Sequence, residues 1–397
     1  MHRSQSRALL LVSDYPFVRV GDEFYAEVPW DESFAALYRP EFGRVLLLGR
    51  LRRGREIPAG WFAVDRNWFE VLDGGDWRGM TGFVFNLPRL WRAVRRVWPR
   101  VGVVYLKLFY LNSLAVFFYN LARFGARKPV VTLLVGDAGE AVVLRRDLFP
   151  FGWQRKSARA IVRAAIQLVQ RNADVPGYIA RTLAEQYGDA RPGVTLAAEP
   201  WIKAEHVVVH DRPAPRQPAT VIFVGRLIDR KRPDHLIRAV AELCREGWDL
   251  RLVLVGDGPE RSRLEALVRR EGLAGRVVFA GWLGLLSDRM LAEYDRADIF
   301  CLPSYAEGLP LVVLEAMARG VAVVATAVNA TPEVVRHEES GLLVPRDDVP
   351  ALTAALRRLL GDARLWRRCV DGGYRVVREY TYEVQRGKLA AATKALI

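Results

Sequence analysis

Cysteine, histidine and long apolar runs are all scarce in this sequence. Its three cysteines, Cys244, Cys301 and Cys369, stand far apart and have no metal-ligand spacing. This argues against a disulfide scaffold and makes a reducing cytoplasm the expected setting. Charged residues interrupt every apolar stretch before it reaches the length of a membrane-spanning helix. The short run Ala8–Val12 is interpreted as a first strand rather than a signal peptide.

Acidic residues are also in the minority, with 45 Asp and Glu against 59 Lys and Arg and a net charge of +14. A basic surface attracts nucleic acid, anionic lipid or phosphorylated substrates. No helix-turn-helix, zinc finger or aromatic RNA-binding motif accompanies the charge, so nucleic acid is not expected as a partner. The length of 397 residues and the 51% hydrophobic content suit two domains with separate cores.

The segment Leu90–Arg100 alternates apolar residues with arginines, as a basic amphipathic helix does. Two interpretations stay open. The helix can be an ordinary surface helix with its apolar face on the core. Alternatively, its tryptophans and arginines contact an anionic membrane surface; these residues are Trp91, Trp98, Arg92, Arg95 and Arg96.

Short β-rich runs alternate with helical stretches in both halves of the chain. In the first half the runs are Ala8–Val12, Arg44–Leu48, Val101–Leu106 and Pro129–Val135. Three prolines in residues 211–219 indicate a linker. The alternation then restarts with a strand at Thr220–Val224 and a helix at Pro233–Glu246. Strands separated by helices pair in parallel, so each half is predicted to be a doubly wound sheet.

Two cations follow the first strand of the second half. Gly225 lets the chain turn sharply at the strand end, Arg226 comes directly after it, and Lys231 follows one turn later. Fixed cations at one strand end suit a pyrophosphate, which leaves as an anion that must be stabilised. The order strand, Gly-Arg-Leu, loop, Lys and helix favours this function over an ordinary solvated basic run.

Two carboxylates follow a later strand. Glu307 precedes Gly308-Leu309-Pro310, which open a helix, and Glu315 lies eight positions further on in an apolar stretch. The N–H groups at the start of that helix form an anion site suited to a phosphate. A carboxylate among apolar residues needs a strong partner, because burying it alone is costly. Val255–Glu260, by contrast, lacks the third glycine of a dinucleotide fingerprint and is interpreted as a tight turn that starts a helix.

Together these motifs resemble glycosyltransferase family 4, the retaining enzymes also described as glycosyl transferases group 1. The resemblance covers about Thr220–Tyr382 and is much weaker before that. It implies an α/β fold of the GT-B type, with two doubly wound Rossmann-like domains facing across a cleft. We expect an acceptor-side domain at residues 1–210, a linker at 211–219 and a donor domain at 220–379. The C-terminal helix, residues 380–397, is expected to cross back onto the first domain.

The resemblance also assigns roles. Arg226 and Lys231 would hold the donor diphosphate, Glu307 the sugar and Glu315 the ribose hydroxyls. The complete expected set has catalytic, donor-binding and acceptor-side members: Arg226, Lys231, Glu307 and Asp137; Gly225, Trp282, Gly308, Leu309, Pro310, Leu311 and Glu315; and Gly21.

This sequence departs from the family at two places. Relatives carry a histidine after the strand that matches Pro129–Val135, whereas here the only histidine before residue 200 is His2. Asp137 either takes over the sugar contact or is an ordinary turn aspartate. Relatives often have Gly-Gly before Pro-Glu, where this chain has Asn329-Ala330-Thr331. Asn tolerates the left-handed conformation that Gly supplies there.

The resulting functional prediction is a retaining glycosyltransferase that moves a sugar from a UDP-, GDP- or ADP-sugar to a carbohydrate or lipid-linked acceptor. The leaving phosphate itself would accept the proton of the incoming hydroxyl, and no cofactor or metal is expected. Polysaccharide or glycolipid synthesis is the expected setting, in the cytoplasm or at the inner membrane face. The alternatives are an epimerase or phosphorylase on the same fold, or a non-catalytic subunit that binds a nucleotide sugar or glycolipid.

Overall fold

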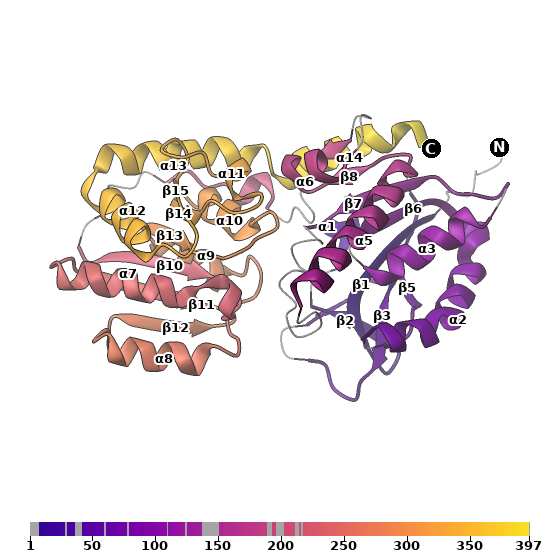
Figure 1. Ribbon diagram of the computed structural model, residues 1–397, viewed down its shortest axis with the longest axis horizontal. Helices are drawn as coiled ribbons and strands as arrows, with labels where there is room; N and C mark the ends of the chain where they lie inside the picture. The colour runs from indigo at the N-terminus through magenta and orange to yellow at the C-terminus, as the bar shows by residue number, and fades with distance from the viewer. Residues whose placement is uncertain are drawn as a thin grey trace. The chain divides into compact units, whose positions relative to one another are not determined.

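The computed structural model divides the chain into two compact units, Met1–Ala198 with Gln385–Ile397, and Glu199–Val384 (Figure 1). The structure describes most of both units. The described residues are 8–27, 30–35, 42–58, 61–77, 79–108, 110–123, 125–136, 151–188, 193–195, 202–210, 214–215 and 217–396.

Among its described residues, the first unit contains a nine-stranded sheet. Seven of its strands run parallel in the order β5-β3-β1-β6-β7-β8-β9. They span Phe69–Asp73, Val45–Arg53, Ala8–Val20, Val101–Leu108, Val130–Leu134, Gly177–Tyr178 and Val194–Thr195. The other two, β2 (Glu23–Ala26) and β4 (Phe62–Ala63), add an antiparallel extension that the sequence pattern did not predict.

The first strand is longer than the sequence indicated. The strand expected at Ala8–Val12 continues to Val20, because residues 17–20 pair with β2 and residues 16–19 pair with β3. Gly21 then forms the turn into β2, with a left-handed φ of 61°. The pairing of β1 with β3 shifts register between Val12 and Pro16, so the strand is irregular where it passes Asp14.

Asp14 links this irregularity to the next helix. Its two carboxylate oxygens accept hydrogen bonds from the backbone N–H groups of Leu111 (3.1 Å) and Asn112 (3.2 Å). These groups lie in the first turn of α3 (Leu111–Leu121), where no neighbouring side chain caps the helix. Burial raises the pKa of Asp14 to about 6, although both backbone hydrogen bonds act in the opposite direction.

The other helices in the described part of the first unit are α1 (Glu32–Ala35), α2 (Gly79–Val97), α5 (Gly152–Arg171), α6 (Arg181–Tyr187) and most of α14 (Tyr382–Thr393). On α2 the apolar residues Leu90, Val94 and Val97 are buried, which confirms that this face lies on the core, while Trp91 is 42% exposed. Membrane contact by α2 stays a prediction.

The second unit follows the predicted alternation closely. Its six strands are all parallel, in the order β12-β11-β10-β13-β14-β15. In that order they span Val277–Gly281, Leu250–Val255, Ala219–Val224, Ile299–Leu302, Ala322–Thr326 and Leu342–Val344. The helices are α7 (Pro233–Arg245), α8 (Arg261–Arg270), α9 (Asp288–Arg296), α10 (Leu311–Ala318), α11 (Thr331–Val334), α12 (Val349–Gly361) and α13 (Ala363–Arg378).

The segment before the proline-rich stretch belongs to the second unit, whereas the sequence placed the first domain up to residue 210. The N–H of Val208 donates to the carbonyl of Ala318 (2.9 Å), and that of His210 donates to the hydroxyl of Tyr374 (3.1 Å). These bonds tie residues 208–210 to the second unit. Residues 211–213 and 216 of the predicted linker lie outside the described residues, and the predicted domain boundaries remain predictions.

Candidate active site

The site is built on the carboxyl ends of β10, β11, β12 and β13, and two glycines allow the segments that follow β10 and β11 to approach closely. A Cβ atom at Gly256 would lie 2.0 Å from the carbonyl oxygen of Gly225, and one at Gly258 would lie 2.3 Å from that of Leu227. Any side chain at either position would displace the segment that follows β10. The turn before α8 therefore holds Gly225 and Arg226 in place, consistent with the tight turn predicted for residues 255–260.

Lys231 and Glu307 lie together in this site. Lys231 ends the short 3-10 helix η3 (Asp229–Lys231), and its Nζ is 2.6 Å from Oε1 of Glu307. The two side chains are only 15% and 8% exposed. Arg226, in contrast, is exposed and lies one strand end away from Glu307. A poorly hydrated cation thus lies beside a carboxylate, and a second cation is accessible to solvent.

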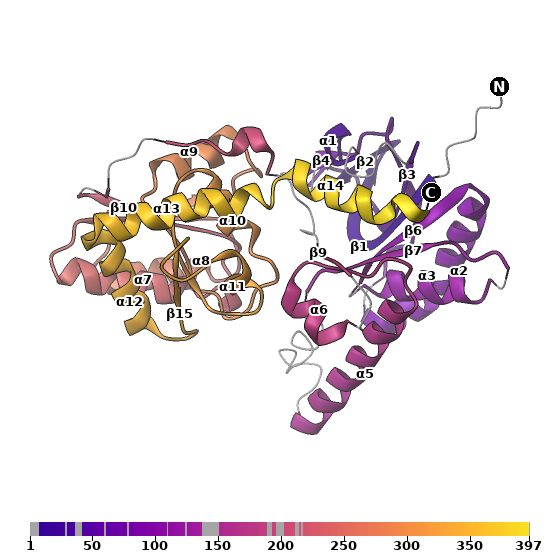
Figure 2. The same cartoon turned by 90° about the horizontal axis from the view of Figure 1, so that it is seen from above.

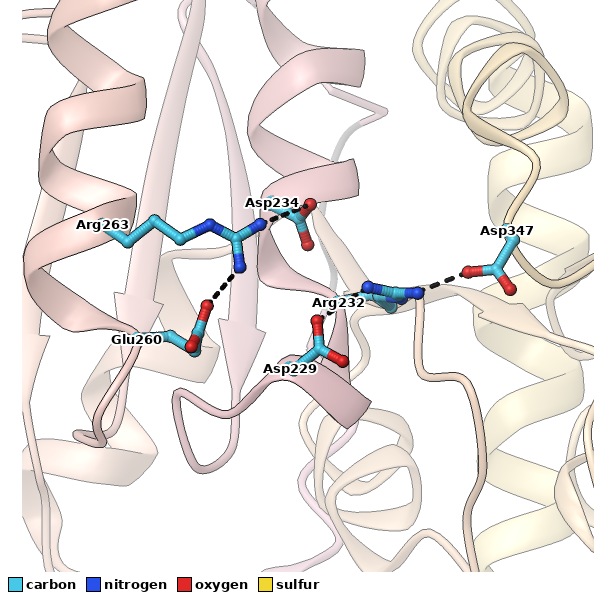
Figure 3. Close-up of polar contacts among 6 residues, drawn as sticks. All are labelled: Asp229, Arg232, Asp234, Glu260, Arg263 and Asp347. Atoms are coloured by element: carbon cyan, nitrogen blue, oxygen red, sulfur yellow. Dashed lines mark hydrogen bonds and ion pairs between the residues drawn. The ribbon is translucent and has the colours of Figure 1, made fainter. Parts of the chain in front are cut away.

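Arg232 fastens the loop that carries Lys231. Its guanidinium bonds the carboxylates of Asp229 (2.8 Å), within η3, and Asp347 (3.1 Å), after β15 (Figure 3). Arg232 itself has a left-handed φ of 51°. A second cluster beside it joins Arg263 to Asp234 and Glu260 (Figure 3). These pairs connect η3 to β15 and α7 to α8, so Lys231 comes from a braced loop.

The loop that carries Glu307 is held from two sides. The N–H of Tyr305 donates to the carbonyl of Arg230 (2.8 Å), and the N–H of Glu307 donates to Oδ1 of Asn329 (3.2 Å). Asn329 has φ 44°, which confirms the left-handed conformation expected where relatives have glycine. Its side chain therefore supplies a contact that glycine could not make.

Glu315 is buried on α10 and only 3% exposed. The partner that its burial required is the hydroxyl of Tyr294, which donates to Oε2 at 2.8 Å. Tyr294 lies on α9 and is fully buried, and burial together with the Glu315 charge raises the pKa of Tyr294 well above its usual value. Sequence reasoning missed Tyr294. The sequence held one indication of this role. Tyr294 lies four residues after Met290 and both are buried on the same side of α9, where a tyrosine hydroxyl needs a hydrogen-bond partner.

The start of α10 brings together the other predicted donor residues. Pro310 occupies the cap position, the helix begins at Leu311, and no side chain caps its first turn. Leu309 and Pro310 are buried, whereas Gly308 and Leu311 are half-buried. The first N–H groups of α10 thus follow Glu307 along the loop that leaves β13. Cations, carboxylates and the start of a helix therefore lie at neighbouring strand ends. This arrangement suits a ligand that has both phosphate and hydroxyl groups.

Comparison with known proteins agrees with this chemistry. The family described as "Glycosyl transferases group 1" matches residues 218–362. A GDP-mannose-dependent alpha-(1-6)-phosphatidylinositol monomannoside mannosyltransferase of Mycolicibacterium smegmatis is 33% identical over 267 residues, which are 61% of this chain and 67% of that relative. The chain belongs to the group 1 glycosyltransferases.

Other similarities are shorter or more distant. An exopolysaccharide phosphotransferase of Streptomyces coelicolor is 43% identical over 152 residues, which are 37% of this chain but only 16% of that protein. The solved structure of a sucrose-phosphate synthase from Thermosynechococcus elongatus has a TM-score of 0.73 at 21% identity and covers 98% of this chain and 99% of its own. This similarity supports the GT-B fold, with its two Rossmann-like domains, for this glycosyltransferase.

Trp282 follows β12 and is 53% exposed. The N–H of Gly256 donates to the carbonyl of Gly281 at 2.8 Å, so Trp282 emerges at the same sheet edge as Gly225. In this glycosyltransferase the indole is therefore open to solvent rather than part of the core, and it follows a strand that lies two places from β10 in the sheet.

Two predicted residues are not joined to this set. Gly21 lies in the first unit, where a cavity of about 240 Å³ is lined by Arg19, Gly21, Arg53 and Gly54. Asp137 lies outside the described residues. Within the part of the chain that the structure describes, no three His, Cys, Asp or Glu side chains gather as metal ligands would. No described helix has the length and apolar character needed to cross a membrane.

Proposed function

We propose that this protein transfers a sugar from a nucleoside-diphosphate sugar to an acceptor hydroxyl, with retention at the anomeric carbon. The observation that carries the proposal is the 2.6 Å pair of Lys231 and Glu307, together with a second carboxylate, Glu315, buried on the helix that follows the Glu307 loop. All three lie in the unit that the family matches. A purely structural role explains them poorly, because a buried ion pair contributes little net stability.

The proposed roles follow from the chemistry of each group. Lys231 and Arg226 bind the diphosphate and stabilise the charge that develops as it leaves. Glu307, once Lys231 turns to the phosphate, accepts hydrogen bonds from sugar hydroxyls. Glu315 binds the ribose, and the N–H groups at the start of α10 add donors to a phosphate. Asp137 is proposed as a further sugar contact, and Gly21 as part of the acceptor side.

Proton transfer needs no separate protein base in this proposal. As the bond between the anomeric carbon and the phosphate oxygen breaks, that oxygen gains charge and takes the proton of the incoming hydroxyl. The new glycosidic bond forms on the same face. Two fixed cations serve the charge stabilisation that a metal would otherwise give, so we propose metal-independent turnover in a cytoplasmic setting.

A donor and product assay tests the function. The name of the mycolicibacterial relative makes GDP-mannose the first donor to try, followed by UDP- and ADP-sugars. The expected result is slow donor hydrolysis without acceptor, faster turnover with a polyol or lipid-linked acceptor, an α-linked product by NMR from an α-linked donor, and no loss in EDTA. An inverted product would overturn retention. Tight nucleotide binding without any turnover would indicate a binding subunit instead.

A further inference from the structure

A basic run at the end of β3 has no part in the proposed donor site. Residues 50–56 read Arg-Leu-Arg-Arg-Gly-Arg-Glu, with four arginines and one acidic residue. The end of β1 lies between this part of β3 and β2 (Figure 2). The run belongs to the first unit, whereas the donor-site cations Arg226 and Lys231 belong to the second. Its charge therefore needs a partner of its own.

Arg19 on β1 and Arg53 on β3 lie directly opposite each other. They are partners in the parallel register of these two strands, and like charges opposite each other on neighbouring strands destabilise a sheet. The Arg19 guanidinium donates to the carbonyl of Gly21 (2.9 Å) and to the carboxylate of Asp22 (2.7 Å), whose side chain is 88% exposed. The guanidinium of Arg53 makes no hydrogen bond or ion pair with any residue that the structure describes. One arginine is thus held in place, and the other is available.

The two arginines line the cavity of about 240 Å³ together with Gly21 and Gly54. A Cβ atom at Gly54 would lie 2.7 Å from Cγ1 of Val18, so a larger residue does not fit there without a shift. Gly21 has φ 61°, and a Cβ atom there would meet nothing within 4 Å. Two cations and two small residues thus surround the cavity, and its described lining holds no carboxylate. This composition suits a small anion.

We propose that this cavity, named here the β1–β3 cavity, binds a phosphate group, either as the free ion or on a small phosphorylated molecule. Two guanidinium groups offer paired N–H donors in the geometry that phosphate oxygens accept. A phosphate between Arg19 and Arg53 also replaces their mutual repulsion with two attractions, because a phosphate monoester carries about −1.5 to −2 charges at pH 7. The proposal concerns binding without a donor and does not rest on the proposed sugar transfer.

The melting temperature in phosphate, compared with chloride of equal ionic strength, tests this site on the full chain. All proteins carry Lys231→Ala and Arg226→Ala, so that the donor-site cations add no phosphate binding. This parent chain should melt at a higher temperature in phosphate. Arg53→Gln should need at least about tenfold more phosphate for the same increase, because one charged contact is lost. Without phosphate it should not melt below the parent, because Arg53 is exposed and its removal relieves repulsion.

Arg52→Gln is the matched control. It removes the same charge from the preceding position on β3, where the side chain points to the other face of the sheet. The guanidinium carbon of Arg52 lies 5.8 Å from the centre of the Trp61 ring instead. Its phosphate response should equal that of the parent. A response that Arg52→Gln loses as fully as Arg53→Gln, or that Arg53→Gln retains, would be a general effect of charge or salt and would overturn the proposal.

Glycerol 3-phosphate and glycerol distinguish the two sources of the phosphate group. A larger increase in melting temperature with glycerol 3-phosphate than with inorganic phosphate would identify a phosphorylated molecule as the ligand. Equal increases would identify the free ion. Glycerol alone, at the same concentration, should have no effect. A parent chain that melts at the same temperature in phosphate, glycerol 3-phosphate and chloride would show that the β1–β3 cavity is not a phosphate site.

Discussion

The two units are built on the same kind of parallel sheet, yet they differ in how closely they follow a repeating pattern. In the second unit six strands alternate with helices, every strand pair is parallel, and the functional side chains lie at strand ends. In the first unit β1 runs past its expected end, an antiparallel extension joins the sheet, and α5 is half uncovered. The regular unit contains the donor-site candidates, and the irregular unit contains Gly21, the candidate for the acceptor side.

The largest effect that would distinguish the second unit from the first is a loss of turnover on substitution of Lys231. Lys231→Ala should lower turnover about 100-fold or more, the scale of one preorganised charge contact, and leave the fold intact. Arg226→Ala should act similarly, because it is proposed to share the diphosphate. Steady-state kinetics with a nucleotide sugar measures both. Arg251→Ala, an exposed arginine on β11 of the same unit, is the control and should turn over normally. Normal turnover of Lys231→Ala would remove this residue from the site.

The two glutamates should separate binding from transfer. Glu315→Gln should weaken binding of the free nucleoside diphosphate about tenfold, because a charged hydrogen bond to ribose becomes a neutral one. Tyr294→Phe should weaken it in the same direction, since the buried Glu315 then loses the hydrogen bond from the Tyr294 hydroxyl. Glu307→Gln should spare diphosphate affinity and reduce transfer. Calorimetry and kinetics on the same three variants report the two effects. Equal loss of diphosphate affinity in Glu307→Gln and Glu315→Gln would show that the roles are wrongly assigned.

In the first unit the expected effect is on stability rather than on donor chemistry. The folded-state pKa of Asp14, about 6, lies above its reference value of 3.8. The folded protein therefore binds this proton more tightly, and the free energy of unfolding falls as pH rises through 6. Between pH 5 and 7 the loss should be about 1 kcal/mol. Urea unfolding at both pH values measures it. Asp14→Asn should remove the difference, and an unchanged difference in that variant would point to another group.

The smallest predicted effect concerns the side chain that holds the Glu307 loop. Asn329→Gly keeps the left-handed backbone but removes the bond to the N–H of Glu307, so transfer should fall only a few-fold, the scale of one neutral hydrogen bond. Asn329→Ala removes the bond and adds backbone strain at φ 44°, so it should also lower stability by about 1 kcal/mol. Comparison of the two variants in activity and melting assays separates these contributions. If Asn329→Gly behaves like the wild type, the hydrogen bond does not position Glu307.

Most of the second unit could be predicted from the sequence alone, because the residues that follow a strand in the chain also lie at the end of that strand in the sheet. Gly225, Lys231 and Glu307 could be placed from the runs that precede them, and they lie together as expected. Partners from distant segments were not predictable. The bond from Tyr294 to Glu315 and that from Asn329 to Glu307 depend on how α9, α10 and β14 pack. The spacing of hydrophobic residues within one helix or strand does not indicate which distant segment will pack against it.

The first unit was predicted less well for a different physical reason. Strand β1 extends to Val20 because β2 pairs with it, and a tight hairpin at Gly21-Asp22 leaves only a weak signal in the sequence. The amphipathic pattern of α2 correctly indicated a helix, but it could not tell which partner covers the apolar face. On α5 the same kind of pattern faces solvent. Hydrophobic spacing identifies a side of a helix, and tertiary packing decides what that side contacts.

In the pair of Lys231 and Glu307, an internal carboxylate already occupies the position that a bound anion would take beside Lys231. An anion that approaches Lys231 must displace a carboxylate already 2.6 Å from Nζ, in surroundings where both groups are poorly hydrated. Inorganic phosphate or chloride would exchange one negative partner for another and gain little. A sugar nucleotide bound as proposed would gain more, because its hydroxyls would give the released carboxylate new hydrogen bonds. Under the proposed roles, the internal counter-ion would thus select ligands by the hydrogen bonds that they offer Glu307, and simple anions would bind weakly.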